Sequence, residues 1–82
     1  MTNAEALKER LLFYDKSNYD VFTISKGVPA GQRISNGYTT SIAPDGDGVF
    51  DLIQVAKNNT HIAFVWMQDG KVIHSSCWWL FS

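Results

Sequence analysis

The chain has 82 residues with a formal net charge of −1, and 45% of its residues are hydrophobic. This length predicts a single domain spanning residues 1–82, and the hydrophobic fraction excludes a disordered chain. The seven Lys and Arg residues are scattered, whereas nucleic-acid binding favours a basic excess or stripe, so we do not expect a nucleic-acid partner.

A single cysteine excludes a disulfide framework and a cysteine-rich zinc site, and it fits a reducing compartment. The first residues lack the pattern of a signal peptide, and no apolar run reaches membrane-spanning length. We therefore expect a cytoplasmic protein that does not enter a membrane.

The first predicted element is a helix over residues 3–17. Thr2 and Glu5 have the spacing of a capping box at its start. An apolar stripe with helical periodicity follows, formed by Ala4, Leu7, Leu11 and Tyr14. Phe13 lies nearly opposite this stripe, so a single buried face does not explain it.

Five segments have the alternation and composition of strands: about 19–25, 38–43, 49–57, 61–68 and 71–81. The glycine-rich segment 26–37 between the first two is predicted to be a long loop. Asn58-Asn59 and Asp69-Gly70 fit turns that join the last three strands into a meander over 49–81. The expected fold is α+β, with the N-terminal helix on one face of a four- to five-stranded antiparallel sheet.

A two-residue turn at Asp69-Gly70 pairs Trp66 with Ile73 and Phe64 with Ser75. This register places one set of side chains on the face expected to meet the helix: Ile53, Val55, Ile62, Phe64, Trp66, Ile73, Ser75, Cys77, Trp79 and Phe81. The other face carries His61, Ala63, Val65, Met67, Val72, His74, Ser76, Trp78 and Leu80, with Phe50 and Leu52 nearby. Because this second face is also too apolar for water, either the sheet curls on itself or a second subunit or partner covers it. We expect a homodimer.

The sequence offers no convincing catalytic or metal-binding set. His61 and His74 would lie roughly 13 Å apart on one face, too far to share a metal. Cys77 and His74 point to opposite faces, and the segment from Asp45 to Asp51 lacks the ligand pattern of a calcium loop. Segment 26–37 lacks the Lys of a phosphate-binding loop after its last Gly. We therefore expect no enzyme activity, no cofactor and no metal.

The remaining interpretation is a small protein-interaction module that binds another protein. Proteins of this size and composition are common among phage or mobile-element accessory proteins and inhibitors, which is an association and not a deduction. The residues expected to contact a partner are Phe13, Gln32, Arg33 and Trp78. The alternative is a small-ligand-binding protein with an aromatic-lined pocket between helix and sheet, or between subunits.

Overall fold

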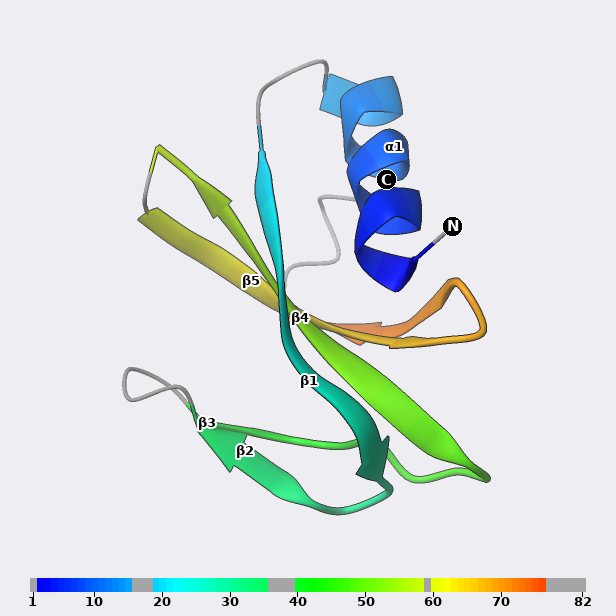
Figure 1. The fold of residues 1–82 in the computed structure, drawn as a ribbon. Helices are drawn as coiled ribbons and strands as arrows, with labels where there is room; N and C mark the ends of the chain where they lie inside the picture. The colour runs from blue at the N-terminus through cyan, green and yellow to red at the C-terminus, as the bar shows by residue number, and fades with distance from the viewer. Residues whose placement is uncertain (1, 16–18, 36–39, 59, 77–82) are drawn as a thin grey trace.

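The chain forms one helix and six strands in a computed structural model that describes residues 2–15, 19–35, 40–58 and 60–76 (Figure 1). In chain order these are α1 (Asn3–Asp15), β1 (Asp20–Pro29), β2 (Arg33–Ser35), β3 (Thr40–Ile42), β4 (Val49–Lys57), β5 (Thr60–Gln68) and β6 (Lys71–Ser75). Strands β1, β4, β5 and β6 form one antiparallel sheet in the order β1-β4-β5-β6, and β2 pairs with β3 in a separate small sheet. The α+β class predicted from the sequence is confirmed.

The start of α1 is fixed by its first polar side chains. The backbone N–H of Glu5 donates to Thr2 Oγ1 at 3.1 Å, and the Thr2 hydroxyl donates to the Glu5 carboxylate at 3.0 Å. These bonds satisfy an amide that the helix itself leaves without a partner. The predicted pairing of Thr2 with Glu5 is thus confirmed, although Glu5 contacts the hydroxyl of Thr2 and not its backbone.

The long loop predicted over 26–37 is wrong, because most of it is strand. β1 continues to Pro29, and β2 begins at Arg33 after a tight turn. The register of β1 against β4 shifts twice, between Thr23 and Ser25 and between Ser25 and Val28. Such bulges bend a strand without ending it, and they allow a glycine in a left-handed conformation such as Gly27, with φ of 65°. Glycine content alone therefore gave a misleading loop signal.

Two further bulges overturn the predicted register of the meander. In β5, Ala56 pairs with His61 but Val55 pairs with Ala63, so the strand carries one extra residue. In β6, Met67 pairs with Val72 as expected, but Trp66 pairs with His74 and not with Ile73. Ser75 accordingly pairs with Val65 and not with Phe64. A one-residue shift moves side chains to the other face of a sheet. Each predicted face therefore combined residues that lie on opposite faces in the structure.

Phe64 and Trp66, which the sequence predicted to lie under α1, are therefore not part of the core beneath the helix. One core fills the space between α1 and the sheet, and its buried side chains in the described part of the chain are Leu7, Leu11, Tyr19, Ile53, Val55, Ala63, Val65 and Met67. Ile53 and Val55 meet the helix as expected, but Trp66 and Phe64 lie on the opposite face. Val65 and Met67, on the face expected to lie open, are almost completely buried beneath the helix.

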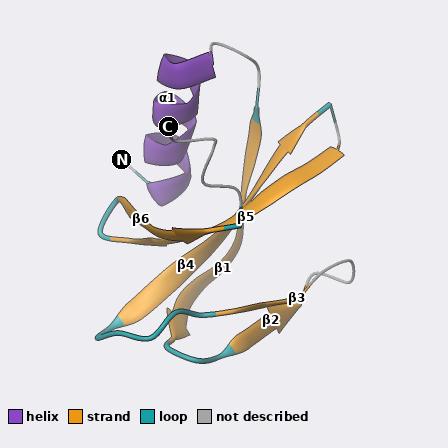
Figure 2. Ribbon diagram, turned by 180° about the vertical axis from the view of Figure 1, so that it is seen from behind, coloured by secondary structure: helices purple, strands orange, loops and turns teal. Residues whose placement is uncertain are grey.

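The second face of the sheet is covered by the chain itself. β2 and β3 fold across it, and Figure 2 shows them on the side away from α1. Among the residues described, the buried side chains of the core between the two sheets are Val28, Ala43, Phe50, Leu52, Phe64 and Trp66. The Trp66 side chain is fully buried, and its indole Nε1–H donates to Ser41 Oγ at 2.8 Å. The sequence analysis left open whether the sheet curls on itself or a second subunit or partner covers its other face. At this end of the sheet, the chain itself provides the cover.

Of the last predicted strand, 71–81, the structure describes β6 and the next residue, Ser76. Ser76 continues the contact with β5, because its N–H donates to the Phe64 carbonyl at 3.0 Å and its hydroxyl accepts from the Phe64 N–H at 2.9 Å. The expected burial of Trp79 and Phe81 lies outside the described residues.

Candidate functional site

The residues expected to bind a partner are only partly described. Gln32 and Arg33 are both exposed, at the turn between β1 and β2 and at the start of β2. The backbone of Phe13 belongs to α1, but its side chain lies outside the described part of the chain. Trp78 lies outside the described residues altogether. Of the four residues predicted to contact a partner, the structure therefore places two, Gln32 and Arg33, on the same exposed segment.

The turn that carries Gln32 is rigidly held by backbone hydrogen bonds. Gln32 N–H donates to the Pro29 carbonyl at 3.2 Å, and Gly31 at the third position of the turn has φ of 79°. This conformation is the one that glycine adopts without steric cost. Gly31 and Gln32 are also bonded to Ala43, at 3.1 and 2.8 Å. A fixed backbone that presents exposed polar side chains is suited to making specific contacts.

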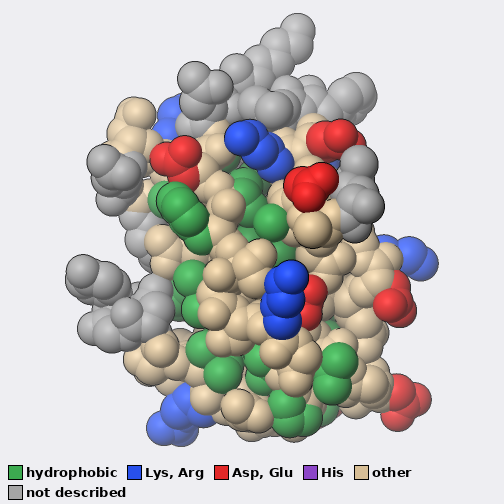
Figure 3. All heavy atoms as spheres, in the orientation of Figure 1, with side chains coloured by type: hydrophobic (Ala, Val, Ile, Leu, Met, Phe, Trp, Pro, Cys, Tyr) green, Lys and Arg blue, Asp and Glu red, His purple; other side chains and the backbone are tan. Residues whose placement is uncertain are grey.

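Exposed hydrophobic side chains flank this turn. Ile42, which pairs with Arg33, is 54% exposed, and Val49, which pairs with Pro29, is also 54% exposed. Pro29 and Ala30 are exposed as well. Ile42 lies on the outer face of the small sheet, because the next residue, Ala43, enters the core between the two sheets. We call Pro29, Ala30 and Val49 the corner patch. Figure 3 shows hydrophobic side chains gathered at this lower end of the molecule, where β1 ends and β4 begins.

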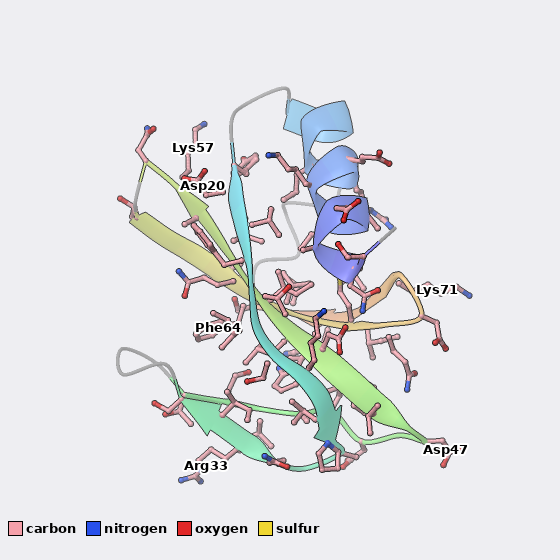
Figure 4. All side chains as sticks on the ribbon, viewed as in Figure 1. Asp20, Arg33, Asp47, Lys57, Phe64 and Lys71 are labelled. Atoms are coloured by element: carbon pink, nitrogen blue, oxygen red, sulfur yellow. The ribbon has the colours of Figure 1, made fainter. Side chains whose placement is uncertain are left out.

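A second hydrophobic group lies further along the sheet, on the face away from α1. Phe22 of β1 is 50% exposed and pairs with Gln54 of β4, which in turn pairs with Phe64 of β5. Phe64, labelled in Figure 4, is buried, whereas Gln54 is half-buried. We call Phe22, Gln54 and Phe64 the Phe22 strip. It forms a row of aromatic, amide and aromatic side chains across three strands.

The sequence analysis did not single out Phe22, Ile42 or Val49. Phe22 lies in a segment that alternates like any half-buried strand, and alternation alone does not tell which of its two faces is exposed. Ile42 and Val49 lie directly before residues that enter the inter-sheet core, Ala43 and Phe50. Since neighbouring residues of a strand point to opposite faces, the burial of Ala43 and Phe50 implies that Ile42 and Val49 are exposed. This inference requires knowing that a second sheet buries Ala43 and Phe50.

The groups considered for catalysis or metal binding do not come together within the described residues. His74 is exposed and pairs with Trp66. The His61 side chain and Cys77 lie outside the described part. No group of three or more His, Cys, Asp or Glu side chains that could hold a metal occurs among the residues described.

The acidic turn between β3 and β4 has a structural role. Gln68 Nε2 donates to the carbonyl oxygens of Asp47, at 2.7 Å, and Val49, at 3.3 Å. These bonds connect the turn to the end of β5. A backbone carbonyl that accepts an amide N–H is directed toward a protein donor, so this contact supports the interpretation of the segment as a turn.

A polar cluster that sequence reasoning missed anchors α1 to the sheet. Asn3 Nδ2 donates to Asp51 Oδ2 at 2.7 Å, while Asn3 Oδ1 accepts from the Gly70 N–H at 3.0 Å. Asp51 Oδ1 also accepts from the Gly27 N–H at 3.2 Å. One asparagine and one aspartate thus join the helix start, the bulge of β1, strand β4 and the β5–β6 turn. We assign these residues to stability and not to binding.

Comparison with protein-family models, with curated proteins and with solved structures finds no match. No helix in the described ranges has the length and apolar character needed to cross a membrane. Surface geometry therefore defines two separate candidate interaction surfaces, the corner patch and the Phe22 strip.

Proposed function

We propose that this protein is a small, non-catalytic module that binds another protein through the Phe22 strip. The observation that carries the proposal is the half-exposed Phe22 side chain, which lies on the sheet face away from α1 in the same row as Gln54 and the largely buried Phe64. Aromatic side chains are strongly enriched among the residues that dominate binding energy at protein interfaces. Gln54 between the two rings supplies a polar group, which gives an interface its specificity.

The position of the strip on the main sheet supports this role. Phe22 and Gln54 belong to neighbouring strands whose backbones are paired, so a partner meets a surface that needs little ordering. Binding to an ordered surface loses less conformational entropy than binding to a flexible loop. The partner implied by this chemistry is a protein that inserts an apolar side chain beside Phe22.

The alternative of a small-ligand pocket between helix and sheet has less support. Leu7, Leu11 and Ile53 meet in that space and are each almost fully buried, so protein side chains occupy it. The inhibitor or accessory role and the cytoplasmic location expected from the sequence remain predictions.

The proposal is tested by affinity purification from the organism of origin with two matched baits. Phe22→Thr keeps a residue with high strand propensity and removes the aromatic ring. Val49→Thr makes a comparable change at the corner patch and serves as the control. We expect Phe22→Thr to lose a protein that the wild type and Val49→Thr both retain, with all three baits folded by circular dichroism. Equal recovery by Phe22→Thr would refute the role of the Phe22 strip.

A further inference from the structure

The chain contains three Asp-Gly pairs, and all of them lie in exposed turns: Asp45-Gly46, Asp47-Gly48 and Asp69-Gly70. Such a pair is where an aspartate side chain reacts most readily with its own backbone, because glycine has no Cβ to shield its nitrogen. For the reaction, the peptide unit that joins the two residues must rotate until the glycine nitrogen reaches the aspartate Cγ. A hydrogen bond that holds this peptide unit therefore slows the reaction.

The peptide unit of Asp69-Gly70 is held by the start of the helix. The Gly70 N–H donates to Asn3 Oδ1 at 3.0 Å, while Asn3 Nδ2 donates to Asp51 at 2.7 Å. Asp69 and Gly70 have φ of 53° and 75°, as a tight hairpin turn requires when both central residues are left-handed. Rotation of this peptide unit breaks the bond to Asn3 and distorts the hairpin, so the fold protects Asp69.

The peptide unit of Asp47-Gly48 is held by the last residue of β5. Its oxygen, the carbonyl oxygen of Asp47, accepts a hydrogen bond from Gln68 Nε2 at 2.7 Å. A Cβ added to Gly48 would lie 3.1 Å from the same nitrogen, so the Gln68 amide lies directly against this glycine. Gln68 thus fixes the orientation of the peptide unit that has to rotate.

The peptide unit of Asp45-Gly46 is not held in this way. In the part of the chain that the structure describes, no group is hydrogen-bonded to the Asp45 carbonyl or to the Gly46 N–H. A Cβ added to Gly46 would lie 3.4 Å from the Phe50 ring, which is an ordinary van der Waals contact. An apolar contact of this kind has no donor or acceptor that sets the orientation of a peptide unit.

We propose that Asp45 is a modification site, at which aspartate converts spontaneously to isoaspartate. The Gly46 nitrogen bonds to Asp45 Cγ, and the carboxyl hydroxyl leaves with the amide proton as water, which closes a succinimide ring. Water then adds back to one of the two ring carbonyls. Addition at Cγ restores aspartate, whereas addition at the α-carbonyl leaves Gly46 attached through Cγ, which is isoaspartate. Asp47 and Asp69 are protected by the side chains that hold their peptide units.

The modification changes the connection between the two sheets. Isoaspartate adds one carbon to the backbone, and Asp45 lies between β3 of the small sheet and β4 of the main sheet. Ala43 and Phe50, on either side of this turn, are both buried between the sheets. The inference does not depend on the proposed function, since no residue of the Phe22 strip takes part.

The test is prolonged incubation of the folded protein, followed by trypsin digestion and electron-transfer fragmentation. This fragmentation distinguishes isoaspartate from aspartate, although the two have the same mass, and cleavage after Lys57 separates Asp69 from the other two sites. We expect isoaspartate to accumulate at Asp45 at least about fivefold faster than at Asp47 or Asp69, the factor that corresponds to about 1 kcal/mol for one hydrogen bond. In urea, the three sites should react at similar rates, because glycine follows each of them.

Two crossed variants test the protection, with circular dichroism to show that each is folded. Asn3→Ala should speed the reaction at Asp69 about fivefold and leave Asp47 unchanged, whereas Gln68→Ala should do the reverse. Asp45→Glu is the matched control, since it keeps the charge but its longer side chain disfavours closure of the ring. It should remove the fastest signal.

Equal rates at the three sites in the folded protein would overturn the proposal, as would unequal rates that persist in urea. Faster reaction at both Asp47 and Asp69 in either crossed variant would overturn the assigned protection, because it would arise from unfolding of the whole domain. None of these measurements involves a partner, so failure of this inference is distinguishable from failure of the proposed function.

Discussion

The hydrogen bond between Trp66 and Ser41 connects the two sheets, and replacing Ser41 with alanine should test its contribution. The Trp66 indole is fully buried, and its Nε1–H donates to Ser41 Oγ at 2.8 Å. Ser41→Ala leaves that donor buried without its partner, which costs about 1–3 kcal/mol. For a domain of this size each kcal/mol lowers the melting temperature by about 4–8 °C. Urea and thermal unfolding followed by circular dichroism measure both quantities.

Two control variants separate the hydrogen bond from other effects of changing β3. Ser41→Thr retains a hydroxyl and has higher strand propensity, so it should recover most of the lost stability. Thr40→Ala changes the exposed neighbouring residue and should alter stability by no more than about 0.5 kcal/mol. If Ser41→Ala proved as stable as Thr40→Ala, the small sheet would not be attached through Trp66, and the two-core account of the fold would be refuted.

Three further predictions concern the helix anchor, the first core and the tight turn. Asn3→Ala removes the bonds to Asp51 and Gly70 and should cost about 1–2 kcal/mol in urea unfolding; an unchanged midpoint would show that the cluster does not hold α1. Leu7→Ala should cost about 2–5 kcal/mol by the same measurement, because Leu7 is buried between α1 and the sheet, whereas a loss below this range would contradict that packing. Gly31→Ala should cost about 1–2 kcal/mol, since φ there is 79° and the added Cβ itself meets no atom within 4 Å; no loss would mean that the turn relaxes freely.

The sequence predicted those parts of the fold that depend on neighbours along the chain. The helix start at Thr2, the stripe through Leu7 and Leu11, and the turn at Asp69-Gly70 are local features, and each is observed. The two bulges in the meander, one in β5 and one in β6, were not predicted. Alternation along a single strand does not reveal which residue is the extra one.

The candidate site was harder to predict for the same reason. Gln32 and Arg33 were identified correctly as exposed residues, although the loop assigned to them is a turn followed by a strand. The exposure of Phe22, by contrast, depends on which side chains cover that face of the sheet. The cover there comes from packing between residues far apart in sequence, such as Ser41 and Trp66.

The central claim is that this protein binds another protein through the sheet face away from α1. The most direct measurement is the change in backbone amide chemical shifts of the isotope-labelled protein when the purified partner is added. The account predicts that the largest changes fall at Phe22 and Gln54, while the exposed helix residues Lys8 and Glu9 hardly change. Changes concentrated on α1, with Phe22 and Gln54 unaffected, would contradict it.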